Sequence, residues 1–189
     1  MAEWTREQII EKIRTGENLA EADLKNVDLS YSNLKGAKLK KADLTGAHLQ
    51  NANLEGADLT GANLENAFLF GSNLKRANLS GALLKGANLQ DTNLEKVNLR
   101  GTNLNGLSLF GAQLDGADCE GADMSDAKLK RASLIETNLK GANLSRAHLQ
   151  RAVLRNADLT NADLTEANLK NADLAGAKTR GAKMNDVVQ

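Results

Sequence analysis

Residues 57–64 read Ala-Asp-Leu-Thr-Gly-Ala-Asn-Leu, which is one and a half copies of a five-residue unit. If the leucine is taken as the centre of the unit, a centre falls at every fifth residue from Leu19 to Met184 without a change of phase. This gives 34 units over residues 17–186. Repetition of this length predicts one repeat domain, in which each unit buries its apolar side chains against its neighbours.

A period of five fits neither a helix nor a straight strand. Successive leucines would drift by about 140° around a helix that turns about 100° per residue. In a strand the odd period would send them to alternate faces. The pattern instead predicts short extended pieces separated by corners, with the alanine and the leucine of each unit pointing inward. Glycine, asparagine and aspartate suit such corners because they tolerate a positive φ angle.

The units resemble the consensus of the pentapeptide-repeat family, A(D/N)LXX, which is written here as Ala-Asp-Leu-Thr-Gly over residues 57–61. The resemblance covers about nine-tenths of the chain. It implies an all-β fold, a right-handed quadrilateral β-helix with four units, or 20 residues, in each coil. Charges of alternating sign recur at this spacing, at Lys35, Glu55, Lys75 and Glu95. The repeat would then form about 8.5 coils, in a rod roughly 41 Å long at about 4.8 Å per coil.

Residues 1–16 depart from the repeat and predict an N-terminal helix that caps the first coil. Thr5 and Gln8 have the spacing of a capping box, and Gly16 supplies a stop. The apolar stripe of this helix, including a hydrophobic staple at its start, would consist of Trp4, Ile9, Ile10 and Ile13. The alternative is a membrane-binding helix, against which the mixed Arg, Glu and Lys polar face argues.

The other end of the repeat has no such helix. Thr179 replaces a core leucine, and residues 187–189 form a short tail. The last coil is therefore expected to be either frayed or covered by another molecule. A homodimer through this end would bury Met184, Val187 and Val188.

Composition bears on compartment and partners. Lysine plus arginine equals aspartate plus glutamate, 24 each, so no overall field attracts nucleic acid or an anionic membrane. A single cysteine excludes an internal disulfide framework. The sequence lacks a long apolar run and a signal-peptide core, and cytoplasm is the expected compartment. We expect no membrane association and no direct nucleic-acid binding.

Nothing in the sequence predicts catalysis, a cofactor or a metal. His48 and His148 lie 100 residues apart, which is five coils, or about 24 Å. Aspartate and asparagine recur at one structural position in every unit, as turn residues would. Cys119 and Met124 replace core leucines, and Cys119 is expected to be a buried apolar residue. Leu107 stands where alanine is usual and should widen a coil locally.

The leading functional hypothesis is a non-catalytic scaffold or regulatory protein that presents a rigid rod surface to a protein partner. The family resemblance supplies an alternative, because some members resemble duplex DNA and modulate or protect type II topoisomerases such as DNA gyrase. Those members are strongly acidic dimers, whereas this chain has zero net charge. A third possibility is a structural or regulatory role in photosynthetic bacteria, in which the family is abundant.

The expected contact surface is the side of the rod whose centres run from Leu29 to Leu169. Residues that flank these centres should point outward, and all three phenylalanines of the chain are predicted to be exposed there. Farther along, the same side should be basic, with Arg146 at its edge. The candidate face comprises Phe68, Phe70, Phe110, Lys128, Lys130, Arg131, Arg146, His148 and Arg151. The alternative is that the phenylalanines lie flat over neighbouring side chains and the charges are solvated.

Overall fold

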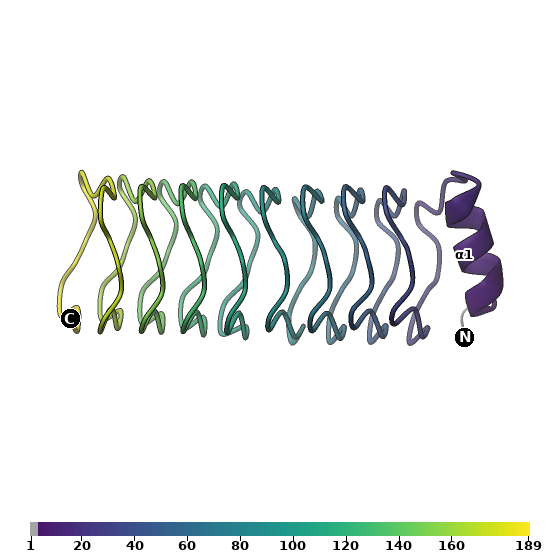
Figure 1. Ribbon diagram of the computed structural model, residues 1–189, viewed down its shortest axis with the longest axis horizontal. Helices are drawn as coiled ribbons and strands as arrows, with labels where there is room; N and C mark the ends of the chain where they lie inside the picture. The colour runs from purple at the N-terminus through teal and green to yellow at the C-terminus, as the bar shows by residue number, and fades with distance from the viewer. Residues whose placement is uncertain (1–3) are drawn as a thin grey trace.

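The computed structural model describes residues 4–189 as a rod of stacked coils (Figure 1). Helix α1, Arg6–Arg14, lies across one end of the stack, and the C-terminus lies in the coil at the other end. The expected helical segment at the start of the chain begins at residue 1, and its first three residues lie outside the described part.

Adjacent coils are joined by parallel backbone bridges, each between a residue and the one twenty positions later. The first pair is Asn18 with Lys38, and the last is Asn168 with Val188. The coil of four five-residue units is therefore confirmed. The alternating charges also pair as expected, because Lys35 Nζ lies 3.1 Å from Glu55 Oε2 and Lys75 forms an ion pair with Glu95.

The bridges correct one part of the all-β expectation. They remain isolated, and no strand longer than one bridged residue occurs within residues 4–189. The bridges stay isolated because, in every unit, the bridged residue is followed by the centre and then directly by a corner. A corner in every unit gives the coil its sides, and it also prevents the extended backbone from lengthening.

The corners have one conformation throughout. Each corner residue, two positions after a centre, has a positive φ angle, from Glu21 to Asp186. The leucine carbonyl accepts a hydrogen bond from the N–H three residues later, as in Ala62 N to Leu59 O at 2.9 Å. A positive φ at the third residue of such a turn is typical of type II. Lys41 and Arg131 also adopt it, so the corner position requires neither glycine nor asparagine.

The centres form the core. Leu94 and nearly all other centre leucines are fully buried, as are Cys119 and Met124. The alanines two residues before the centres are also buried and form columns along the corners, while the intervening side chains point outward. Asparagines and aspartates before the centres accept a hydrogen bond from the N–H two residues later, as Asn63 Oδ1 does from Glu65 N at 3.1 Å. This confirms their expected turn role.

Helix α1 begins at the predicted capping box. Thr5 Oγ1 accepts from Gln8 N at 3.3 Å, and Gln8 Oε1 accepts from Thr5 N at 2.8 Å. The helix ends at Arg14, and Gly16 follows with φ of 77°. Ile9 is fully buried, whereas Ile10 and Trp4 are partly buried against the same core. Lys12 Nζ lies 5.0 Å from the centroid of the Trp4 ring.

Candidate interaction surface

Two sides of the rod carry the features of interest. The Leu29 side has its centres at every twentieth residue from Leu29 to Leu169. The adjoining Leu24 side has them at the same spacing from Leu24 to Met184. On the Leu29 side, successive bridges align His48, Phe68, Lys128 and His148 in one column. The predicted residues of this side are therefore brought onto one surface.

The phenylalanines are only partly as predicted. Phe68 and Phe70 are 44% and 42% exposed, whereas Phe110 is half-buried. The expectation that all three are exposed is wrong for Phe110, because the Arg131 guanidinium lies over its ring, with Cζ 5.9 Å from the ring centroid. The Phe68 ring also has a neighbour, His48, at 4.8 Å between ring centroids. The alternative, that the rings lie against neighbouring side chains, therefore holds for Phe110 and in part for Phe68.

The basic part of the Leu29 side is exposed. Within residues 4–189 its members form no ion pair with a carboxylate: Lys128, Lys130, Arg131, His148 and Arg151. Arg146 differs, because its Nε and Nη2 bind both oxygens of Asp126 at 2.8 and 2.7 Å. These hydrogen bonds lower the pKa of Asp126. Arg146 therefore contributes little net charge to the face at whose edge it lies.

Sequence reasoning missed one aromatic residue of this side. Tyr31 is 76% exposed and occupies the corner after Leu29, with φ of 58°. Arg131 and Arg151 occupy the equivalent corner five and six coils later. Tyr31, Arg131 and Arg151 are related by multiples of twenty residues. The spacing in the sequence is therefore sufficient to predict that Tyr31 lies on this surface.

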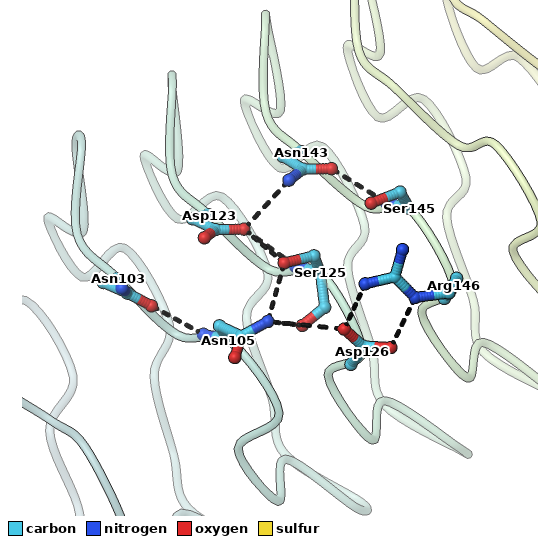
Figure 2. Close-up of polar contacts among 8 residues, drawn as sticks. All are labelled: Asn103, Asn105, Asp123, Ser125, Asp126, Asn143, Ser145 and Arg146. Atoms are coloured by element: carbon cyan, nitrogen blue, oxygen red, sulfur yellow. Dashed lines mark hydrogen bonds and ion pairs between the residues drawn. The ribbon is translucent and has the colours of Figure 1, made fainter.

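The Leu24 side carries a ladder of polar side chains (Figure 2). Asn105 Nδ2 donates to Ser125 Oγ at 2.8 Å and to Ser125 O at 3.0 Å. Asp123 Oδ1 accepts from Ser125 Oγ at 2.6 Å and from Asn143 Nδ2 at 3.1 Å. Each side chain thus bonds its own turn and the next coil, so this part of the side is held in one arrangement.

The last coil is bonded to the one before it, since Val188 N donates to Ala167 O at 3.0 Å. Its inward positions are nevertheless incompletely covered. Leu174, Met184 and Val187 are partly buried, Thr179 is exposed, and Val188 is 50% exposed. Apolar side chains are therefore accessible at this end of the rod.

The remaining residues that could take part in metal binding or catalysis are the acidic side chains, Cys119 and the two histidines. In the described part of the chain, histidine, cysteine, aspartate and glutamate form no group of three or more that could hold a metal ion. Burial raises the pKa of the Cys119 thiol to about 12, so the thiol stays protonated near neutral pH. His48 and His148 are separated by five successive bridges, as predicted. Among residues 4–189, no helix has the length and hydrophobicity needed to cross a bilayer.

These features define the class of protein. The stack is a right-handed quadrilateral β-helix, as in the solved structures to which it is similar. The sequence profile described as "Pentapeptide repeats" matches the chain in overlapping segments, with 8 copies over residues 15–46, 37–76, 77–112, 108–146 and 142–186. The chain therefore belongs to the pentapeptide-repeat family.

Two solved structures illustrate the relationship. HetL, a pentapeptide repeat protein involved in heterocyst differentiation regulation from the cyanobacterium Nostoc sp. strain PCC 7120, is 31% identical, with 97% of this chain and 96% of that chain covered and a TM-score of 0.53. Trypsin-treated QnrB1, a plasmid-mediated fluoroquinolone resistance protein, is 22% identical over 74% of this chain and 82% of that chain, with a TM-score of 0.58. The second likeness concerns the fold alone. No curated protein sequence matches the chain significantly.

Proposed function

We propose that the protein is a non-catalytic scaffold or regulatory protein that presents the Leu29 side to a protein partner. The observation that carries this proposal is the combination, on one side, of exposed Phe68 and Phe70 with four cations and His148, none of which has a carboxylate partner in the described residues. Aromatic and arginine side chains are enriched at protein interfaces. The regulatory role stated for HetL, which is similar along almost its whole length, supports the same kind of function.

Two double variants test the face. A partner captured with the intact protein would be purified, and its affinity measured by calorimetry with Phe68→Ser/Phe70→Ser and with Lys128→Glu/Lys130→Glu. Both changes should weaken binding by about tenfold or more, because each removes side chains from the centre of the contact. Arg76→Glu, on another side, is the matched control. Unchanged affinity in both double variants, with folding intact, would exclude the face.

The alternative function is a modulator or protector of DNA gyrase. The β-helix shared with QnrB1 favours it only at the level of the fold. The balance of 24 basic and 24 acidic residues opposes a mimic of duplex DNA, which requires dense negative charge. A gyrase supercoiling assay, with and without the protein and a fluoroquinolone, separates the two functions. Protection or inhibition at stoichiometric concentration would replace the leading proposal.

We also propose that α1 shields the first coil. Ile9 and Ile13 belong to the same apolar cluster as Leu19, and Arg6 donates to the carbonyl oxygens of Asp28 and Ser30 at 2.8 and 2.7 Å. Deletion of residues 1–16 should expose apolar side chains and unpaired backbone groups, and should produce oligomers in light scattering. A truncated chain that stays monomeric and equally stable to heat would contradict this role.

A homodimer through the opposite end is a further proposal. It is supported by the accessible apolar side chains of Met184, Val187 and Val188. Light scattering would establish the oligomeric state, and Val188→Lys should convert a dimer to a monomer because it places a charge in an apolar contact. A monomeric intact protein at high concentration would end this proposal.

A further inference from the structure

The backbone ladder is interrupted once between residues 39 and 188, on the Leu24 side. The coil that contains Leu84 and the coil that contains Leu104 lack five hydrogen bonds that the coil pairs before and after them form. For example, Leu64 N donates to Leu83 O and Leu104 N donates to Asp123 O, both at 2.7 Å. The missing pairs are Gly81 with Arg100, Asn103 with Ala82, Leu84 with Asn103, Gly86 with Asn105, and Ser108 with Ala87.

Two substitutions in the repeat coincide with this opening. Leu107 is buried at a corner position where the coils on either side have Ala87 and Ala127, and the missing bond from Ser108 to Ala87 lies directly beside it. The larger side chain therefore holds the two coils apart, in agreement with the predicted local widening. Leu83 stands where its neighbours in register are Asn63 and Asn103, and it is 54% exposed.

The parted coils enclose a cleft of about 420 Å³. Apolar surface comes from Leu83 and Leu107, and amide side chains come from Asn103 and Asn105. Asn105 is held in place by its bonds to Ser125 in the next coil (Figure 2). Glu65 and Lys85 both line the cleft, so its charged groups are of opposite sign.

The backbone of the cleft has hydrogen-bonding groups without partners in the described residues. Besides Gly81 at the edge of the opening, the N–H groups of Leu84, Gly86, Asn103 and Ser108 are free donors, and the carbonyls that they would meet are free acceptors. The ladder is closed again on both flanks, where Leu79 N donates to Asn98 O at 2.9 Å and Leu89 N donates to Ser108 O at 3.1 Å. A long strand cannot enter between these closed flanks, but a short segment can.

We propose that this cleft binds an uncharged peptide unit with a branched apolar side chain, presented by a loop of the partner protein. The apolar side chain would contact Leu83 and Leu107, and the peptide group would satisfy the free donors and acceptors of the parted coils. A ligand without charge fits a cleft lined by one acid and one base. The proposal rests on the proposed interaction function, and it adds a second contact on the side adjoining the Leu29 side.

Hydrogen exchange followed by NMR tests whether the cleft is open in solution. The amides of Leu84, Gly86, Asn103 and Ser108 should exchange about tenfold or more faster than the amides in the same positions of the adjacent coil pairs, because only the latter are bonded in the ladder. Those reference amides belong to Leu64, Asn66, Asp123 and Lys128. Equal protection of the two sets would overturn the proposal.

Titration of the isotopically labelled protein with N-acetyl-leucine methylamide tests binding. Resonances of residues 83–86 and 103–108 should shift with a dissociation constant of about 1 mM, which is ordinary for a ligand of this size. N-acetylglycine methylamide lacks the side chain and isobutanol lacks the peptide group, so each should bind about fivefold more weakly or not at all. Equal binding of isobutanol, or shifts spread along the whole rod, would overturn the proposal.

Leu107→Ala introduces the usual residue and should close the ladder. The four amides should become protected and the ligand-induced shifts should disappear. Val97→Ala is the matched control, because Val97 also replaces an alanine but its coil contacts are intact, with Asp118 N donating to Val97 O at 2.9 Å. This control should bind like the parent chain. Leu83→Asn should keep the amides open and weaken binding about fivefold through the lost apolar wall.

Ligand binding that persists in Leu107→Ala would also overturn the proposal. Failure of these titrations would leave binding through the Leu29 side unaffected, because that surface is tested with its own variants. Conversely, if the variants exclude the Leu29 side as a binding surface, the amide exchange rates at the cleft and the resonance shifts caused by the small ligands should be unchanged.

Discussion

The cleft lies between the coils that contain Leu84 and Leu104. This pair and the coil pairs before and after it along the rod have the same five-residue units and the same register. They differ in ladder closure: the bonds between the coils of Leu64 and Leu84 and between the coils of Leu104 and Met124 are complete, whereas five are missing between the coils of Leu84 and Leu104. Val97 and Thr137 also replace alanines at corners, and the bonds around both are intact. Only Leu107 is accompanied by parting of the coils. The comparison shows that the alanine columns set how closely coils approach, and that they tolerate valine or threonine but not leucine.

The largest effect is expected for truncation of a core leucine in a closed coil. Leu94→Ala should lower the free energy of unfolding by about 2–5 kcal/mol, because it leaves a cavity in a fully packed layer. Leu84→Ala should cost less, since Leu84 lines the cleft, so that part of the space around it is already unfilled. Urea denaturation monitored by circular dichroism measures both. Glu95→Ala, an outward change that breaks the half-buried pair with Lys75, should stay within about 1 kcal/mol.

The corner glycines Gly86 and Gly106, in the two parted coils, allow a closer comparison of the stability cost of one substitution. A Cβ atom on Gly86 would overlap Asn66 Oδ1, whereas one on Gly106 would meet nothing within 4 Å. Both corners have a positive φ, so each change to alanine should cost about 1 kcal/mol for the backbone conformation. Gly86→Ala should cost clearly more, because Asn66 must move. Equal unfolding midpoints for the two variants would show that the Asn66 side chain reorients freely.

Protonation should affect the closed part of the Leu24 side. Asp163 Oδ1 accepts hydrogen bonds from the Thr165 hydroxyl and N–H, and Lys183 binds its other oxygen. These contacts lower the pKa of Asp163 to about 2. Because the folded pKa lies below the unfolded value of about 3.9, the stabilisation is complete above about pH 4 and is lost as the pH falls towards 2.

Urea titrations at several pH values would measure this loss. Asn occupies the same position in other coils, as at Asn63 and Asn143, so Asp163→Asn is expected to fold. It should show a shallower decrease in stability below pH 4 than the parent chain. An unchanged slope would mean that other carboxylates, such as Asp58 with its bond to Thr60, dominate the acid sensitivity.

The smallest effect is expected at Leu83. Leu83→Asn should restore the side-chain bond to the N–H of residue 85 that other coils form, and should raise the free energy of unfolding by about 1 kcal/mol or less. The matched change Val153→Asn introduces the same side chain at an equivalent position in a closed coil pair. If neither variant gains stability, the turn bond contributes nothing measurable in this fold.

Much of the surface could be predicted from the spacing alone. The column of His48, Phe68, Lys128 and His148 follows from twenty-residue steps, and so does the outward direction of its members. The half-buried state of Phe110 could not be predicted, because it depends on how the Arg131 side chain lies across the neighbouring coil. Whether the face binds a partner is a separate question that the register does not address.

The sequence by itself determined the architecture. A period of five with an inward alanine and leucine requires a corner in each unit to keep the apolar side chains on the inside, and the family resemblance implies four such units per coil. Tertiary structure decided where the stack is imperfect. The opening beside Leu107 depends on three-dimensional contact between residues twenty positions apart, and on whether a side chain larger than alanine can be accommodated between two coils without breaking their hydrogen bonds.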